Sequence, residues 1–293
     1  MLARRDVLRL IPASSLAWLA GFQRAQADTR PSSAPSPLAG PPVVQHLTDE
    51  GFAVSFAVGQ LATGWVEWGL APDRLDQRAI ASRAGLIDAS DRAIVVPVSL
   101  QRRATPGQPL YYRVVAQPLA YESAYKLHRG TPVASTTYSL RVPDRAASQV
   151  RVAVINDTHE QPKTLKAIAA RIEAVRPDAL VWNGDTCASA FDAPADAARV
   201  LLSQEWAITR PLVFVPGNHD VRGACARSVR DCLAAGPNAS LPYNVARRHG
   251  PLALLTLDTG EDKPDAHPVF AGTAAYEPYR ARQAAWLREA LAR

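Results

Sequence analysis

The sequence has little that would place it in a membrane or on a nucleic acid. Its main N-terminal apolar run, residues 10–22, is too short and too interrupted to span a bilayer stably. Despite a formal net charge of +6, it has no stripe of basic residues with interleaved aromatics. We therefore expect neither a transmembrane protein nor a nucleic-acid-binding one. A chain of 293 residues still has room for two domains with well-sized cores.

Cysteine is also scarce, with three in the whole chain. Cys187 is expected to be a small buried hydrophobe rather than a ligand. Cys225 and Cys232 are seven residues apart, which on a continuous helix separates their Cα atoms by roughly 10 Å, too far for a disulfide. In a loop the two could pair, and an oxidising compartment would favour that. Both possibilities stay open.

The first 27 residues have the pattern of an export signal. Arg4-Arg5 is a twin-arginine pair, the apolar run follows, and Ala25-Gln26-Ala27 places small residues at the cleavage positions. This predicts a periplasmic or secreted protein. Removing the segment takes away four of the 33 basic residues and one of the 27 acidic ones, so the net charge falls from +6 to +3.

The next part of the chain indicates a linker and then an all-β domain. Residues 28–42 are rich in proline and serine, which is typical of a partly extended linker. From 43 to 142, apolar residues alternate with small or polar ones in several short runs separated by turn signals, as in Phe52-Ala53-Val54-Ser55-Phe56. About seven short strands over some 100 residues predict a β-sandwich. Tyr112 is placed where a tyrosine corner would fall.

Residues 148–293 change to alternating strands and helices. Helices are predicted at 162–175 and 195–208, a hairpin between 243 and 258 with its turn at 247–250, and an amphipathic helix at 283–291. Three runs, 150–155, 179–182 and 211–216, are predicted to be buried strands. The fold class is therefore an N-terminal all-β sandwich followed by an α/β domain.

Each of these three strands is followed by residues that bind metals. Asp157 and His159 follow the first strand, Asp185 the second, and Asn218-His219-Asp220 the third. Functional groups in α/β sheets gather at the carboxyl ends of strands, so the three loops should share one rim. Carboxylates, imidazoles and an amide oxygen suit hard or borderline dications. Because Asp157 and His159 are two residues apart, an extended chain would point both side chains the same way.

Singly, each motif has a plainer explanation. Asp157 is suited to cap the following helix, Gly184-Asp185 to form a turn, and His219 to be a satisfied core histidine. All three motifs in order, each after an apolar strand, favour a metal site.

The three motifs together resemble those of the calcineurin-like metallophosphoesterases, namely Asp-x-His, Gly-Asp and Gly-Asn-His-Asp/Glu. The resemblance implies that Asp157 and His159 bind a first ion, that Asp185 bridges two ions, and that Asn218 binds the second. It also implies that His219 lies near the leaving group, with Asp220 holding its ring. The β region resembles the fibronectin-type-III-like domain that precedes the catalytic domain in purple acid phosphatases, which implies two packed sheets flanked by helices in the catalytic part.

The implied cofactor is a pair of divalent ions, manganese, iron or zinc, and the substrate a small phosphate mono- or diester. The implied reaction is in-line attack by a hydroxide that bridges the two ions. Arg222 is a candidate for a bidentate contact to phosphate, although a solvated surface arginine is the preferred interpretation. Purple acid phosphatases have a tyrosine ligand where this chain has Ala188, so a tyrosinate–iron centre is not expected.

The sequence departs from the family near its end. The family's later His motif and Gly-His-x-His motif are missing before Arg293, which predicts a catalytic domain incomplete at its C-terminus and weak or no activity in this chain. Two alternatives stay open. One is a non-catalytic exported binding or adhesion protein that retains the hydrolase scaffold. The other is an active enzyme that takes its remaining ligands from a partner chain or from His249 or His267.

Overall fold

One six-stranded sheet runs through both the N-terminal and the C-terminal regions of the chain. The computed structural model describes residues 36–292 apart from 82 and 102, so the predicted export signal and residues 28–35 of the linker lie outside it. The strand order is β10-β11-β12-β1-β2-β5. Its bounds are β10 (Val152–Ile155), β11 (Ala179–Asn183), β12 (Leu212–Val215), β1 (Val43–Gln45), β2 (Gly51–Ala57) and β5 (Ala93–Ser99).

The short strand β1 joins the two halves of this sheet. It runs parallel to β12, with Gln45 opposite Leu212, and antiparallel to β2. Successive side chains of a strand point to opposite faces. Accordingly Val43 packs into the core of the α/β region and Val44 into the core of the β-sandwich, both fully buried. Gln45 is also buried, and its amide oxygen accepts hydrogen bonds from Ser55 Oγ and Ala234 N at 2.8 and 2.9 Å.

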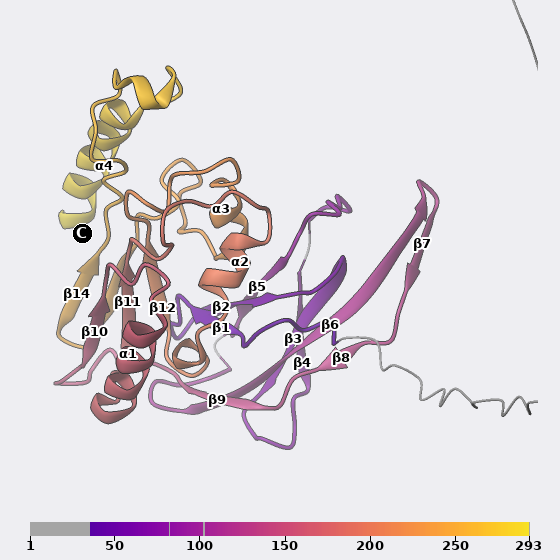
Figure 1. Ribbon diagram of the computed structural model, residues 1–293. Coiled ribbons are helices and arrows are strands. Elements are labelled where there is room, and N and C mark those ends of the chain that lie inside the picture. Colours follow the sequence, from indigo (N-terminus) through magenta and orange to yellow (C-terminus); the bar gives the residue numbers. More distant parts are fainter. Residues whose placement is uncertain (1–35, 82, 102, 293) are drawn as a thin grey trace, which may run out of the picture. The chain divides into compact units, whose positions relative to one another are not determined.

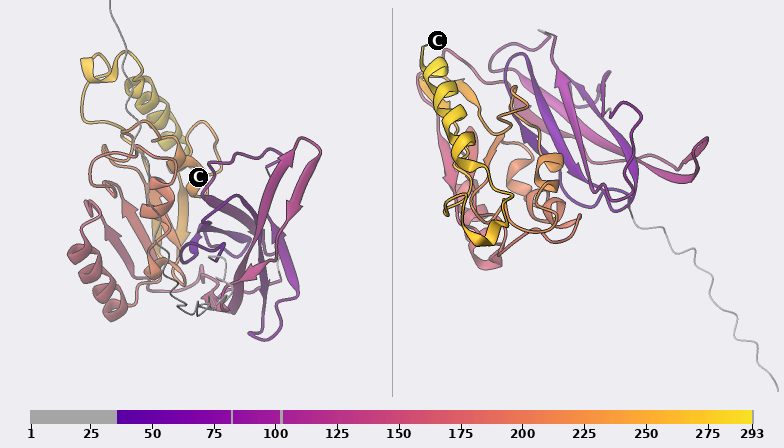
Figure 2. Two further views of the ribbon diagram at one scale, coloured as in Figure 1. Left: turned by 45° about the vertical axis from the view of Figure 1, so that its right-hand side comes forward. Right: turned by 90° about the horizontal axis from the view of Figure 1, so that it is seen from above.

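The second sheet covers the sandwich face of β1, β2 and β5 (Figure 2). It contains β4 (Gln77–Ile80), β3 (Ala62–Gly69), β6 (Pro109–Ser123) and β7 (Lys126–Arg129), with β8 (Val133–Ala134) and β9 (Tyr138–Arg141) also paired to β6. Phe52, Val54 and Phe56 of β2 point into the core between the sheets, as their alternation predicted. Residues 35–293 form one compact unit, so a separate 43–142 domain of fibronectin type III stays a prediction.

Tyr112 links this sandwich to the α/β region. Its ring is fully buried in the sandwich core, and its hydroxyl donates to the carbonyl of Ile208 at 2.7 Å. Burial raises the pKa of this phenol well above its usual value. The expected tyrosine corner, a bond to backbone a few residues upstream, is therefore wrong; the bond crosses to a residue 96 positions away.

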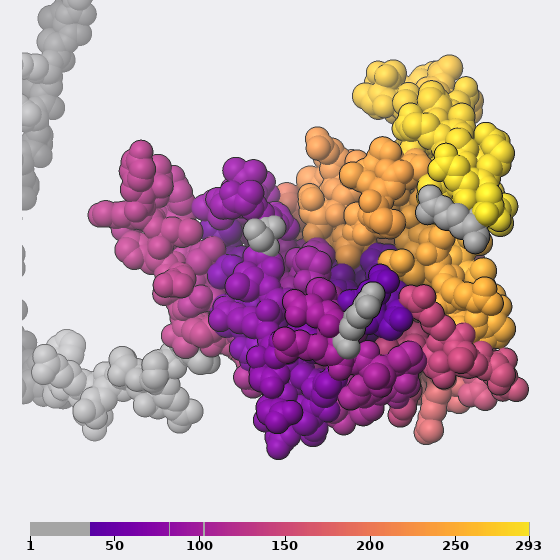
Figure 3. Space-filling view, turned by 180° about the vertical axis from the view of Figure 1, so that it is seen from behind, coloured from indigo at the N-terminus to yellow at the C-terminus, as the bar shows by residue number. Residues whose placement is uncertain are grey.

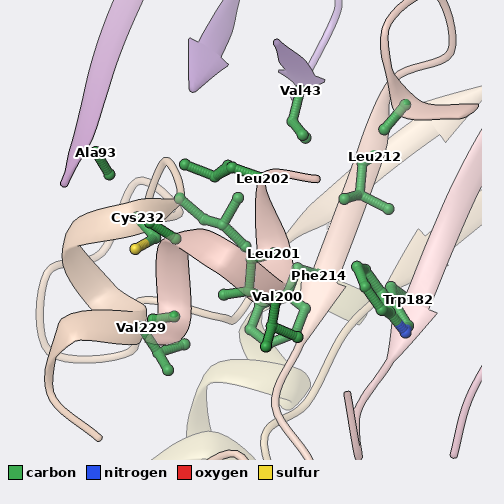
Figure 4. Close-up of a cluster of buried hydrophobic side chains, with 14 of the residues drawn as sticks. Val43, Ala93, Trp182, Val200, Leu201, Leu202, Leu212, Phe214, Val229 and Cys232 are labelled. Atoms are coloured by element: carbon green, nitrogen blue, oxygen red, sulfur yellow. The ribbon is translucent and has the colours of Figure 1, made fainter. Parts of the chain in front are cut away.

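The three parallel strands β10, β11 and β12 form the framework of the α/β region (Figure 1). Helix α1 (Pro162–Val175) occupies the predicted residues and packs its apolar side against their core. Figure 4 shows this core, where Leu201 and Val200 of α2 (Asp196–Leu201) lie with Trp182 and Phe214. The fold class of a mixed sheet with helices is confirmed for this region.

Three predicted elements have different bounds. The helix expected at 195–208 ends at Leu201, the chain extends at Gln204, and a short 3-10 helix η1 (Glu205–Ala207) follows. This change of direction lets the Trp206 ring pack against Trp182, with centroids 5.1 Å apart. The hairpin consists of β13 (Ala246–His249) and β14 (Leu252–Leu255), so its turn falls at Gly250-Pro251 instead of 247–250.

The C-terminal helix α4 (Tyr276–Leu291) begins seven residues before the predicted start. The remaining elements are α3 (Ser228–Cys232) and the 3-10 helix η2 (Pro268–Phe270). Within the part of the chain that the structure describes, no helix is both long and apolar enough to cross a bilayer.

Candidate metal centre

The loops that follow β10 and β11 are joined by backbone hydrogen bonds. Asp157 N donates to Gly184 O at 3.1 Å, His159 N to Asp185 O at 3.0 Å, and Glu160 N to Thr186 O at 2.9 Å. These bonds continue the parallel pairing of the two strands past their ends. They bring Asp157, His159 and Asp185 to one rim, as the position of the motifs predicted.

Two glycines let the third loop approach the second. A Cβ on Gly184 would lie 2.4 Å from Gly217 N, and a Cβ on Gly217 would lie 2.2 Å from Asp185 Oδ1. Gly184 also has a φ of +77°, which disfavours other residues. The glycine of the Gly-Asp motif therefore makes room for the neighbouring loop.

Backbone strain is concentrated in the same loops. Asp157, His159 and Asp185 have φ angles of +52°, +44° and +50°, which are uncommon for non-glycine residues. Such strain persists where the surrounding structure holds it, and it is frequent at functional sites. The expectation that Asp157 and His159 align on an extended chain is wrong, because both are left-handed. They still meet, with His159 Nε2 3.8 Å from Asp157 Oδ1.

Three side chains come close enough to hold one metal ion. His159, Asp185 and His219 each offer a ligand atom, and these atoms all lie within 4.8 Å of one another. His159 Nε2 is 4.0 Å from Asp185 Oδ2, and the two imidazole rings meet edge to face at 4.8 Å. His219 Nδ1 is buried without a hydrogen-bond partner among the described residues. A buried orphan nitrogen beside a carboxylate and a second imidazole fits a borderline dication.

Both histidines are held from behind. His159 Nδ1 lies 3.2 Å from the carbonyl of Cys187, which orients the ring so that Nε2 faces the carboxylates. His219 N donates to Asp185 Oδ1 at 3.0 Å. The ring contact of His159 fixes the orientation of its imidazole, whereas the backbone bond of His219 holds the Asp185 carboxylate. Asp157 is the outermost of the group, with a side chain that is 59% exposed against 15% for Asp185.

Asn218 is close to Asp185, and in the absence of an ion its amide nitrogen is the end that suits this carboxylate. In the orientation that satisfies its neighbours, Nδ2 donates to both Asp185 oxygens at 3.1 and 3.2 Å, and Oδ1 accepts from Arg222 Nη2 at 2.8 Å. Binding a metal through Oδ1 would need the amide to turn and would place its NH₂ against the guanidinium. The residues present therefore fit one ion better than two.

Arg222 is neither a solvated surface residue nor free for phosphate. Its Nε and Nη2 donate to the two carboxylate oxygens of Glu261 at 2.7 and 2.6 Å, and Nη2 lies 3.4 Å from Asp262. The Glu261 side chain is 1% exposed. Burial acts to raise its pKa, but the hydrogen bonds from Arg222 outweigh this and hold that pKa well below the usual range. The bidentate fork predicted for Arg222 is thus present with a protein carboxylate as its partner.

Asp220 does not hold the His219 ring in this structure. Its Oδ1 accepts from Thr186 N, Thr186 Oγ1 and Cys187 N at 3.0, 2.6 and 3.3 Å, and its Oδ2 from Gly217 N at 2.9 Å. The carboxylate, 1% exposed, ties the third loop to the second. Its role is to position the loops that carry Asp185 and His219.

The other predicted candidates lie outside the cluster. Cys187 is a buried thiol whose pKa is raised to about 12 by burial and by the nearby Asp220 charge, as expected of a structural cysteine. Cys225 and Cys232 are both free thiols. His267 caps η2 by accepting from Val269 N, and His249 ends β13 with a pKa lowered by burial. Among the described residues, the ligand cluster contains neither of these histidines.

Sequence reasoning missed Glu261 and its neighbours. They line a cavity of about 570 Å³ at the rim, together with Asp157, Asp185, Asn218 and the α4 residues Glu277 and Arg280. Residues 261–267 were seen only as a polar loop, with His267 as their candidate. Nothing local distinguishes Glu261, because its partner Arg222 is 39 residues earlier in the chain.

Parallel strands that end in a shared Asp/His rim are the arrangement of an α/β domain with a metal site at its strand ends. The comparisons agree: residues 150–268 match the family model described as Calcineurin-like phosphoesterase. The recognition of calcineurin-like motifs is thus confirmed for residues 150–268, the part of the chain that matches the family model.

A solved structure shares the fold. It is the purple acid phosphatase PPD1 from yellow lupin (Lupinus luteus) seeds, which is 17% identical, with a TM-score of 0.52 and coverage of 71% of this chain. The matched part is 43% of that protein, so this chain spans less than half its length. No match was found among the curated proteins.

Proposed function

We propose that the chain is a metal-dependent phosphoesterase that holds one divalent ion firmly and a second only weakly. The observation that carries this is the convergence of His159, Asp185 and His219 within 4.8 Å at the ends of parallel strands. Asp157 completes the first site from its exposed edge. For the second ion, the predicted ligands are only Asp185 and Asn218, and the amide of Asn218 must first rotate.

A bound dication of this kind supplies a nucleophile from water near neutral pH and neutralises phosphate charge. The protein's own contribution is positioning. Asp185 is anchored by His219 N, His159 by the Cys187 carbonyl, and the loops by Asp220. The ring nitrogen of His219 that does not bind the ion is the proposed proton donor to the leaving group, because this ring lies beside Asp185 in the ligand cluster. The proposed substrates are phosphate mono- or diesters, and the proposed ions manganese, iron or zinc.

The test combines metal stoichiometry with turnover. Metal-stripped protein is titrated separately with Mn²⁺, Fe²⁺ and Zn²⁺, and hydrolysis of 4-nitrophenyl phosphate and bis(4-nitrophenyl) phosphate is followed. We expect about one ion per chain after dialysis, and turnover well below the usual enzyme range of about 1–10³ s⁻¹. Two firmly held ions with brisk turnover would overturn the one-ion proposal. No bound ion and no turnover would overturn the phosphoesterase.

The alternative of an exported binding or adhesion protein is favoured by one feature, the hairpin of β6 and β7. Tyr121, Tyr125 and Leu127 near its tip are 59%, 99% and 45% exposed. Exposed apolar side chains gathered on one element are typical of an interaction surface. If this is the function, Asp185→Asn leaves binding unchanged, whereas Tyr125→Ser abolishes it.

Export of the chain through a twin-arginine signal is likewise a proposal, supported by Arg4-Arg5 and Ala25-Gln26-Ala27. The expected mature protein begins at Asp28. N-terminal sequencing of exported protein checks this, and Arg4→Lys with Arg5→Lys should keep the chain inside the cell.

A further inference from the structure

A second cavity shares lining residues with the one at the candidate metal centre and has a different composition. Its volume is about 990 Å³, the upper end of what small-molecule sites occupy. The loop at 220–230, η2 and the first turns of α4 provide its walls. Figure 3 shows α4 and the residues before it, in yellow, standing beside the orange residues that form the opposite side.

Cationic side chains outnumber acidic ones in this lining. It contains five cations, Arg222, Arg227, Arg230, Lys263 and Arg282, against the three carboxylates of Asp220, Asp258 and Glu261. Arg222 and Lys263 are paired with Glu261 and Asp262. Among the described residues, Arg227, Arg230 and Arg282 form no ion pair within 4 Å. At that distance these three guanidinium groups have no carboxylate partner in the described part of the chain, and Arg230 also interacts with Asp258 and Tyr243.

The three carboxylates cannot neutralise those arginines effectively. Asp220 accepts its four bonds from the loops, and Glu261 is held by Arg222. Asp258 accepts from Gly260 N at 2.9 Å and from the Tyr279 hydroxyl at 3.0 Å, and burial raises its pKa. The lining still has five cationic side chains against three carboxylates, and such an excess of positive charge attracts anions.

Aromatic rings supply the rest of the wall. Tyr243, Phe270, Tyr276 and Tyr279 all line the cavity, with Phe270 and Tyr276 edge to face at 6.0 Å. Arg282 lies 5.7 Å from the Tyr279 ring centroid. Flat aromatic ligands stack on such rings, and arginine stacks on the ligand in turn. The lining therefore fits an aromatic ring that carries a negative charge.

The cavity adjoins the metal rim, because two residues line both. Glu261 and Lys263 line both this cavity and the one that contains Asp157, Asp185 and Asn218. Resting on the phosphoesterase proposed above, we infer that this cavity receives the leaving group of the ester, and that the preferred leaving group is aromatic and carries its own anionic substituent. Arg230 and Arg282 bind the substituent, and the tyrosines bind the ring.

The experiment uses two matched esters and one product. Hydrolysis of 4-carboxyphenyl phosphate is compared with that of phenyl phosphate, and 4-hydroxybenzoate binding is measured by calorimetry. We expect a preference for the carboxylated ester. Arg230→Gln and Arg282→Gln should each reduce 4-hydroxybenzoate affinity about fivefold, and together about twentyfold, with a matching loss of the preference. Arg288→Gln, on the same helix outside the cavity, should change neither.

Each outcome bears on one of the two proposals. Hydrolysis of both esters with equal efficiency and no 4-hydroxybenzoate binding would overturn the cavity assignment alone. Binding that the double variant does not weaken would also overturn it. Binding that depends on both arginines without hydrolysis of either ester would overturn the phosphoesterase and keep the aryl-anion site. All variants change exposed arginines, and unchanged melting temperatures confirm that they fold.

Discussion

The two sides of the candidate metal centre are built in opposite ways. The first side, residues 156–160 and 184–187, holds its ligands through backbone bonds between neighbouring loops and through left-handed residues. The second side, residues 217–222 with 261–263, holds Asn218 through Arg222, which is itself paired with the buried Glu261. The first side leaves carboxylate and imidazole atoms open to an ion, whereas the second places a cation beside its ligand. A guanidinium at that distance opposes a second dication by charge repulsion.

Removing the shared carboxylate should have the largest effect. Asp185→Asn keeps the acceptor for His219 N but removes the negative charge that attracts the ion. We expect loss of the bound ion and a fall in kcat/KM of about 10³-fold, the equivalent of several kcal/mol of transition-state stabilisation. Metal analysis after dialysis and a 4-nitrophenyl phosphate assay measure this. Asp73→Asn, in an exposed turn, is the control. An Asp185→Asn protein with full metal content would show that the first side is not the binding site.

Adding a methyl group where the two sides meet should destabilise the fold. The Cβ of Gly217→Ala would lie 2.2 Å from Asp185 Oδ1 and 2.5 Å from Asp185 N. We expect the free energy of unfolding to fall by about 3 kcal/mol in a denaturant titration. Gly107→Ala is the matched control, because Gly107 has a φ of +78° but nothing within 4 Å of its Cβ. It should cost only about 1–2 kcal/mol of backbone strain. Equal losses would mean that the contact between the loops is unimportant.

Changing Asp220 distinguishes a residue that positions loops from one that orients the His219 ring. Asp220→Asn places an amide NH₂ group among donors, including Gly217 N at 2.9 Å and Thr186 N at 3.0 Å. We expect the free energy of unfolding to fall by about 2 kcal/mol. Thermal melts and the pH profile of activity are measured together, with exposed Asp231→Asn as control. An unchanged melting temperature with a shifted pH profile would instead support the role in holding the ring.

Breaking the ion pair of the second side should have the smallest effect. Glu261→Gln should cost about 1.5 kcal/mol at neutral pH, since Arg222 is partly solvated and keeps Asp262 as a neighbour. The pKa of Glu261 is lowered in the folded state, so the pair's stabilisation is complete above the ordinary value of 4.5 and is lost as pH falls towards the folded-state value. The difference between wild type and variant should shrink below pH 4.5, whereas Glu289→Gln should show no difference at any pH. A difference in stability between wild type and Glu261→Gln that stays constant with pH would show that the Glu261 charge is not its cause.

The local pattern of apolar residues predicted the strands and helices whose structure depends mainly on their own sequence. The three parallel strands and α1 occupy the residues that their apolar patterns indicated. The predicted burial of the first strand is wrong, because β10 lies at the edge of the sheet and Val154 is 64% exposed. The helix after Ala195 failed because Trp206 packs against Trp182, a contact that requires the chain to leave the helix at Leu202. The periodicity of apolar residues indicates a helical preference, but it contains no information about a contact with a residue as distant in sequence as Trp182.

The candidate site likewise has features that the sequence predicts and features that depend on distant partners. The positions of Asp157, His159 and Asp185 at strand ends were predictable because strand topology determines them. The roles of Asp220 and Arg222 were not, because their partners Thr186 and Glu261 are 34 and 39 residues distant. A motif shows which residue types are present. Only the fold shows which of these side chains already form hydrogen bonds or ion pairs with one another.

Because strand β1 packs against both cores, it limits how the two parts of this fold can be separated or exchanged. Its Val43 is buried in the core of the α/β region, while Val44, next to it, is buried in the core of the sandwich. A fragment that starts at residue 148 would lose the neighbour of β12 and expose Leu212, so the catalytic part cannot simply be excised. Exchanging the N-terminal sheet between related proteins would succeed only if the incoming β1 carried matching side chains on both faces.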